Sequence, residues 1–469
     1  MFSKIFLSLF ITTTAFASYE SAEKIYGRGS LSQNGFRNTI IELVDSGYHF
    51  SAVPWMKNFL VQNSRPLDGE LERAFDKMIS VTGVKPFETL PEEILSRSRS
   101  GNVRYILAKR LMKKGKDQEA LDHLNKVGPE HPAYAYILHM KAAVHASMGK
   151  NKDAESYFRD CVRVSERQSE NAKSVLQQNQ FKLNRDFCLA GIARAQFGDR
   201  HHAQAELNYL DIQKSSFVWP EILFEEAWAS YYVKNYNRTL GKLVTYKAPV
   251  FKFVFKPEVE VLKALAYMKL CLHEDTSKTV DDFYDEFYNP AKDLRKFLNS
   301  RGKDYKYYYH LMSDHEADKS MPLPIISNIL SSIQKEGAFI EMKGALFSAM
   351  TEYNELRKKR SSKFRNSLSN NLKVTIDDYR TVLGAYIRTG MVSKYAELYT
   401  AFEGMSYIKL ETLASKKERL YRTDSPNDGR KRGDIKYIQR NDKQYFWNFN
   451  GEFWADELGD YVFALRSEC

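Results

Sequence analysis

A short signature recurs along the middle of the chain and constrains its fold more than any other feature. Each copy begins with a glycine, or a polar residue in its place, and a small residue follows five positions later. The glycine favours the left-handed backbone that ends a helix in a sharp turn, and the small residue lets the next helix pack closely against the first. The copies begin at Gly115, Gly149, Gly198 and, more weakly, Lys234. The signature therefore predicts successive antiparallel helix pairs over residues 101–245.

Further positions keep the same register. The small residues five positions after each turn are Ala120, Ala154, Ala203 and, in the weak copy, Thr239. A second small residue lies seven positions before each turn, at Ala108, Ala142, Gly191 and Ala227. A larger apolar residue follows each small residue by one helical turn, at Leu124, Phe158, Leu207 and Leu243. The first two turns are 149 − 115 = 34 residues apart, whereas the next are 198 − 149 = 49 apart.

This pattern resembles the tetratricopeptide-repeat (TPR) family, whose unit is a pair of helices repeating every 34 residues or so. The resemblance covers residues 101–245 well and extends weakly to 20–100 and 255–290. Two departures stand out: Arg104 takes the place of an expected aromatic residue, and the polar stretch 165–184 lengthens one interval. We interpret that stretch as a lengthened helix pair or a protruding loop.

The resemblance implies a protein or peptide partner bound on a concave surface lined by the first helix of each pair. On the family's pattern, the candidate partner-binding residues are Tyr105, Lys109, Lys113, Tyr136, His139, Phe224, Trp228, Tyr231 and Tyr232. Aromatic and basic side chains there would suit a peptide with acidic and apolar residues. The alternative is that several of them only pack against neighbouring helices.

The first 17 residues have the pattern of a secretory signal peptide, with Lys4, a short apolar run and the cleavage motif Ala15-Phe16-Ala17. Cleavage is expected after Ala17, and no cysteine follows to carry a lipid anchor. We therefore expect a soluble exported protein in the periplasm or outside the cell, without a membrane span or a role with nucleic acid. The net charge of +11 is scattered along the chain, which favours a solvated basic surface.

Four cysteines are present, and an oxidising compartment would permit disulfides between them. Cys161 and Cys188 could pair if the segment between them loops out, or they could be two buried thiols. His310 and His315 lie five positions apart, which does not place both on one helix face, so we expect surface residues there and no metal. No cofactor motif is present.

The predicted fold class is all-α, with five regions along the chain. They are a signal peptide (1–17), degenerate helical repeats (18–100) with turns at Gly47 and near Gly83, a TPR-like solenoid (101–320), a long antiparallel helical hairpin (321–423), and a linker with a small β-meander (424–469). In the solenoid, Pro290 is expected to break a helix. In the hairpin, residues 366–373 are expected to form the turn between the two helices. A basic run at 357–365 is either a solvated tip or a docking patch for an acidic surface.

The last region changes character, because residues 435–440 alternate as in a strand and Asn450-Gly451 is a strong hairpin signal. Strands are expected at 445–449, 452–454 and 461–465. The dense aromatic residues predict a small core or, alternatively, a surface for stacking sugars or peptides. The phrase 446–459 loosely resembles the closing segment of exported repeat proteins of gliding or predatory bacteria.

No catalytic motif occurs, and we do not expect an enzyme. Two functions are compatible with the sequence. The first is a cell-envelope scaffold that binds protein partners through its repeats. The second is a protein that binds or hydrolyses cell-wall glycan through the aromatic C-terminal segment, where Glu452, Asp456 and Glu457 lie beside aromatic residues.

Overall fold

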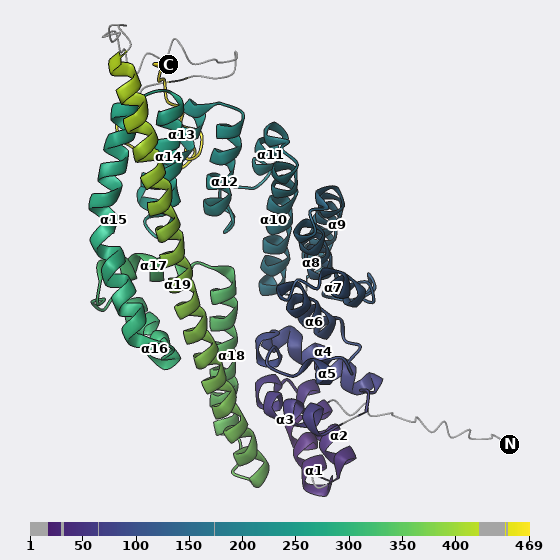
Figure 1. Cartoon of the computed structure of the whole chain (residues 1–469). Helices are drawn as coiled ribbons and strands as arrows, with labels where there is room; N and C mark the ends of the chain where they lie inside the picture. Colours follow the sequence, from purple (N-terminus) through teal and green to yellow (C-terminus); the bar gives the residue numbers. More distant parts are fainter. Residues whose placement is uncertain (1–16, 30–31, 64, 173, 422–445, 447–448) are drawn as a thin grey trace, which may run out of the picture. The chain divides into compact units, whose positions relative to one another are not determined.

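The computed structural model describes residues 17–29, 32–63, 65–172, 174–421, 446 and 449–469 (Figure 1). All regular structure within these residues is helical, as the all-α prediction requires. The chain divides into two compact units. The first combines residues up to 103 with 344–379, and the second combines 104–343 with 380–469.

The first unit begins with helices that pair in sequence order around a mostly apolar core. Gly47, at φ 90°, makes the predicted turn between α2 and α3, and Ala52 and Met56 beyond it are fully buried. Gly83 also has a positive φ and ends α4, but only a short 3-10 helix and one helical turn follow. The elements are α1 (Tyr19–Gly29), α2 (Gln33–Asp45), α3 (His49–Gln62), α4 (Gly69–Thr82), η1 (Lys85–Phe87) and α5 (Glu92–Leu95).

The first unit is completed by the ends of two later helices, α18 (Gly337–Lys358) and α19 (Lys363–Tyr421). The turn between them is at 359–362, and the predicted turn at 366–373 is wrong because those residues lie within α19. Ser362 explains the difference, since its hydroxyl accepts a hydrogen bond from the Arg365 amide (3.1 Å) and so caps a new helix. Phe364, 2% exposed, then packs between the rings of Tyr19 and Trp55.

The second unit contains the repeats. Its helices are α6 (Gly101–Lys113), which starts in the first unit, α7 (Asp117–Leu124), α8 (Tyr134–Ser147), α9 (Asn151–Glu170), α10 (Val175–Gly198), α11 (His202–Tyr209), α12 (Trp219–Tyr232), α13 (Tyr236–Val244), α14 (Glu258–Lys269), α15 (His273–Arg301), α16 (Tyr305–Glu316) and α17 (Pro324–Gln334), with 3-10 turns η2 (Thr245–Lys247) and η3 (Pro249–Phe251). From α7 to α15, each helix packs chiefly on its neighbours in the sequence.

Five helix pairs in this unit share one turn. The turn residue has a positive φ in each case, at Gly115, Gly149, Arg200, Lys234 and Cys271. The amide of each turn residue bonds to the carbonyl three positions back, and the next amide bonds to the carbonyl five positions back, at distances of 2.9–3.0 Å. This is the Schellman pattern that satisfies the last carbonyls of a helix.

The turns reveal an error in the predicted register of the third pair. Gly198 lies within the last turn of α10, and the left-handed residue is Arg200. The small residue five positions later is therefore Ala205, which is fully buried, whereas Ala203 is exposed. Leu207, predicted inside, is 59% exposed, and Tyr209 takes its place at 2%.

The polar stretch 165–184 lengthens a helix pair and does not form a protruding loop. Helix α9 has 20 residues and α10 has 24, and they pack against each other along much of their length. The structure joins Cys161 and Cys188 by a disulfide across this pair, with their Cα atoms 6.2 Å apart. Pairing of the two cysteines therefore does not require the segment between them to loop out.

Helix α15 runs unbroken for 29 residues and contains Pro290, so the predicted break is wrong. The second-unit part of α19 lies alongside it (Figure 1), and the ring of Phe402 meets that of Phe283 at 5.0 Å. Buried side chains before and after Pro290, among them Phe283 and Leu294, hold both halves in place. This packing offsets the roughly 3 kcal/mol that an internal proline costs a helix.

The C-terminal residues 449–469 form no strand, so the predicted strands at 452–454 and 461–465 are absent. The predicted strand at 435–440 and most of that at 445–449, the linker and the signal peptide lie outside the described residues, except for Ala17. The tail lies instead on the second unit, where Asn237 bonds to both backbone groups of Leu465 at 3.0 Å. A disulfide between Cys271 and Cys469 holds its end.

Candidate functional site

The predicted partner-binding residues on α6 differ in exposure. Tyr105 packs against the core formed by Ala108, Leu111 and their neighbours. Lys109 is half-buried and Lys113 is exposed. Of these three, Lys113 offers its side chain most freely to a partner.

The two predicted residues on α8 take part in packing between helices. The ring of Tyr136 stacks on that of Phe181 at 5.7 Å. The Nδ1 atom of His139 lies 2.9 Å from the Asn184 side-chain oxygen. Burial lowers the pKa of His139, so its imidazole is held in the neutral form.

The four predicted residues on α12 form a continuous aromatic row. The ring of Trp228 lies 6.4 Å from Phe224, 5.5 Å from Tyr231 and 5.9 Å from Tyr232. Phe224 is 6% exposed and belongs to a core cluster, whereas Tyr232 is 51% exposed. The row therefore leads from the core to the surface, with Tyr232 at its accessible end.

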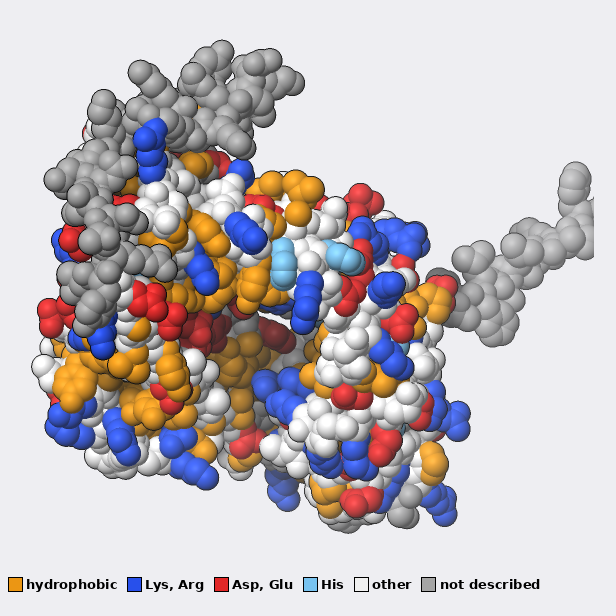
Figure 2. Space-filling model, turned by 45° about the horizontal axis from the view of Figure 1, so that its top comes forward, with side chains coloured by type: hydrophobic (Ala, Val, Ile, Leu, Met, Phe, Trp, Pro, Cys, Tyr) orange, Lys and Arg blue, Asp and Glu red, His pale blue; other side chains and the backbone are white. Residues whose placement is uncertain are grey.

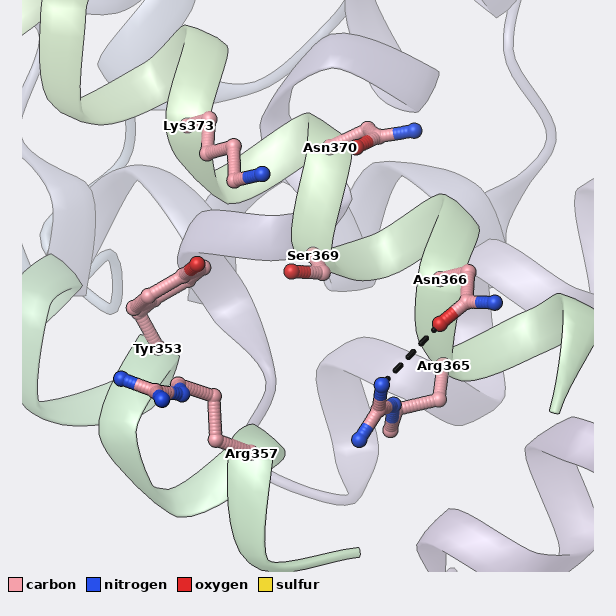
Figure 3. Close-up of a pocket in the computed structure, with 7 residues that line it drawn as sticks. All are labelled: Tyr353, Arg357, Arg365, Asn366, Ser369, Asn370 and Lys373. Carbon is pink, nitrogen blue, oxygen red and sulfur yellow. Dashed lines mark hydrogen bonds between the residues drawn. The ribbon is translucent and has the colours of Figure 1, made fainter. Parts of the chain in front are cut away.

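A second candidate site lies at the end of the α18–α19 hairpin, within the first unit (Figure 3). It is a pocket of about 440 Å³ lined only by polar side chains. Helix α18 contributes Tyr353 and Arg357, and α19 contributes Arg365, Asn366, Ser369, Asn370 and Lys373. The lining thus carries three cationic groups and no carboxylate.

Sequence reasoning placed Arg357 and Arg365 in a basic run but missed the other lining residues. The signal was present, because Arg365, Ser369 and Lys373 follow each other at intervals of four, the spacing of one helix face. Assigning residues 366–373 to a turn concealed that face. The adjacent interval from Asn366 to Asn370 is four as well.

On the face seen in Figure 2, basic and acidic side chains are interspersed, and neither sign of charge dominates.

In the part of the chain that the structure describes, no group of three or more His, Cys, Asp or Glu residues could hold a metal ion. None of the described helices combines the length and apolar character needed to cross a membrane.

Comparison with known proteins gives no assignment to a family. No protein-family model matches the sequence, and no curated protein is significantly similar to it.

Proposed function

We propose that this chain is an exported TPR-like scaffold whose solenoid of helix pairs binds a protein partner in a bacterial cell envelope. The observation that carries the proposal is the shared turn of five consecutive helix pairs, with a buried small residue five positions after each turn. Stacked helix pairs of this kind present extended surfaces for binding other proteins.

Two accessible residues define the surface to test. Lys113 is exposed at the end of α6, and Tyr232 is exposed at the end of α12. The ring of Tyr232 stacks on the His202 imidazole at 4.6 Å, so it is held in place before a partner arrives. A fixed aromatic side chain and a free cation suit a partner segment with acidic and apolar residues.

The aromatic C-terminal segment is less suited to the alternative function of glycan binding. The rings of Phe449, Phe453 and Tyr461 meet one another edge to face at 5.2–5.8 Å. Phe453 and Tyr461 also pack against the core cluster that includes Trp219. Phe453 and Tyr461 are therefore engaged in packing, whereas Phe449 and Trp454 keep exposed surface.

The test places a photo-crosslinking amino acid at position 113 or 232 of the full-length protein in its native envelope. The proposal expects the same defined protein to be crosslinked from both positions. A matched control at Tyr407, 74% exposed on α19, should not give that product. Identical products from all three positions, or none from 113 and 232, would refute a partner on the repeats.

A substitution adds an independent measurement. Replacing Lys113 by Glu should weaken the partner's affinity by about fivefold, since reversing one exposed charge at an interface costs on the order of 1 kcal/mol. The far-UV circular dichroism should not change. Unchanged affinity would remove Lys113 from the site.

A further inference from the structure

The pocket between α18 and α19 concentrates positive charge that the surrounding chain does not neutralise. Neither Arg357 nor Lys373 forms an ion pair with any residue that the structure describes. Both are exposed and line the pocket, Arg357 from α18 and Lys373 from α19 (Figure 3). Bringing like charges together is unfavourable, and the cost falls when an anion binds between them.

Three carboxylates on the same stretches are engaged with other residues. Glu352 is half-buried and accepts hydrogen bonds from the Phe50 and Ser51 amides at 3.0 and 2.8 Å. Glu355 pairs with Lys358 at 2.6 Å. Asp378, beyond the pocket on α19, pairs with Lys57 at 3.4 Å. None of these carboxylates lines the pocket.

Arg365 adds a donor at the pocket wall. One terminal nitrogen of its guanidinium lies 3.1 Å from the Asn366 side-chain oxygen, which fixes its orientation. Its Nε atom is buried and has no hydrogen-bond partner among the described residues. A buried donor without a partner is costly, so the Arg365 guanidinium beside the pocket keeps one unsatisfied donor.

The neutral lining residues indicate what kind of anion would fit. Tyr353 and Ser369 provide hydroxyl groups on opposite walls, and Asn366 and Asn370 provide amides (Figure 3). Hydroxyls and amides both donate and accept hydrogen bonds, as recognition of a ligand's own hydroxyl groups requires. At about 440 Å³, the pocket has the size of a small-molecule site.

The geometry points to a binding site for the phosphate monoester of a polyol or sugar, held by Arg357, Arg365 and Lys373. A phosphate monoester carries a charge of about −1.5 to −2 near pH 7, which matches three cations better than a single carboxylate does. Arginine also matches the geometry of phosphate oxygens with paired donors. The ester could be a free metabolite or the headgroup of a lipid.

The test measures binding of glycerol 3-phosphate to the full-length protein by calorimetry, with glycerol as the uncharged comparison. Binding should occur only with the phosphate. The double variant R357Q/K373Q should lower the affinity by about tenfold or more, since each charge-assisted hydrogen bond to phosphate is strong. The matched control is R360Q/K363Q, which removes the same charge from the same hairpin end but not from the pocket lining.

Vesicles distinguish the two sources of the phosphate. Sedimentation with vesicles containing phosphatidic acid, whose headgroup is a phosphate monoester of glycerol, compared with phosphatidylcholine alone, tests the lipid headgroup. Pelleting that is lost in R357Q/K373Q and kept in R360Q/K363Q would assign the site to a lipid. Calorimetric binding without pelleting would assign it to a free ester.

Two results would overturn the proposal. One is an equal loss of binding in both double variants, which would show general attraction to a basic surface. The other is the absence of binding in both assays while circular dichroism shows that the protein is folded.

The variant Tyr353→Phe provides a further check, because it removes one hydroxyl group without altering the charge. It should weaken binding of the ester more than binding of inorganic phosphate.

Discussion

Lys242 and Glu226 form an ion pair inside the second unit, where their side chains are 1% and 5% exposed. Burial raises the pKa of Glu226, while the ammonium of Lys242 opposes that rise. A buried pair of this kind contributes little net stability relative to apolar residues, but losing one partner leaves a charge without compensation.

We therefore predict that Lys242→Met lowers the free energy of unfolding by about 3–5 kcal/mol, whereas the double variant K242M/E226L is close to wild type. Urea titration of both variants measures the difference. Lys296→Met is the control, because Lys296 pairs with Asp293 on the surface and its loss should change stability by less than about 1 kcal/mol. Equal losses in the single and double variants would contradict the prediction.

Individual residues also show where sequence reasoning succeeded and failed. Gly115 and Gly149 were placed correctly because glycine adopts a positive φ without strain. Arg200, Lys234 and Cys271 adopt it as well, at a cost of roughly 1–2 kcal/mol for a residue with a Cβ atom. Glycine is therefore an incomplete guide to these turns. Gly198 led to a wrong register for the third helix pair. The small buried residue five positions after the turn is the more reliable signal.

Gly191 was also assigned wrongly as the small position of the third helix pair, for a different reason. A Cβ atom there would lie 2.5 Å from the Phe158 ring, so the position is small because α9 packs against it. It is not the repeat's small position, which is Ala193, fully buried and seven residues before Arg200. A sequence pattern cannot separate these two reasons for a small residue.

At the scale of helices, α3 depends on a residue far away in the sequence. Its N-cap residue, Tyr48, makes no side-chain cap. Glu352 of α18 supplies the cap instead, accepting from the amides of Phe50 and Ser51 and from the Ser51 hydroxyl at 2.6 Å. Such a contact joins residues about 300 positions apart, so no local pattern could have predicted it.

Removing this cap should destabilise the first unit. We predict that Glu352→Ala lowers the free energy of unfolding by about 1–3 kcal/mol, because buried donors lose their partner. Glu355→Ala, one turn along α18 and paired with Lys358 on the surface, should change it by less than about 0.5 kcal/mol. Urea titration measures both variants.

The stability difference between wild type and Glu352→Ala should also depend on pH. Burial raises the pKa of Glu352 above its usual value, so the folded protein binds its proton at a pH where the unfolded chain does not. The advantage of wild type should therefore grow as pH falls from neutral through the raised pKa, and level off below about pH 4.5, where the unfolded chain is protonated too. An advantage that shrinks on acidification would mean that the hydrogen bonds to the ionised form dominate.

At the scale of the molecule, each unit is assembled from two separate segments of the chain. Helices α18 and α19 each contribute residues to both units. The predicted boundary at residue 321 therefore separates no independent module, and truncation there would remove part of each unit. Periodicity revealed the repeats, but it could not show which distant helices complete them.

The C-terminal tail completes the second unit through close backbone contact at Gly241 of α13. A Cβ atom at this position would lie 1.6 Å from the carbonyl oxygen of Tyr461. Alanine normally stabilises a helix interior by about 0.5–1 kcal/mol relative to glycine. We predict instead that Gly241→Ala lowers the free energy of unfolding and accelerates amide hydrogen exchange at Phe463 and Leu465. Gly344→Ala of α18 is the control. Nothing lies within 4 Å of its Cβ position, so this substitution should raise the free energy of unfolding by the usual amount.

The disulfide between Cys271 and Cys469 closes a loop of 198 residues. It should stabilise the protein by a different mechanism from that of the tail's hydrogen bonds, which hold the folded tail in place. In the chain-entropy account, a disulfide acts mainly by restricting the unfolded chain. We therefore predict that Cys469→Ser lowers the stability of the protein by about 2–4 kcal/mol.

The local consequence should be confined to the last residues. The amide of Glu468 donates to Leu270 at 2.9 Å beside the disulfide, so its hydrogen exchange should accelerate in Cys469→Ser. The amides of Phe463 and Leu465 should stay protected, because both bond to Asn237 at 3.0–3.1 Å without help from the disulfide. Equal acceleration at all three amides would show that the disulfide itself holds the tail on the repeats. Asn237→Ala, with both cysteines intact, should give the complementary result, with exchange faster at Leu465 than at Glu468.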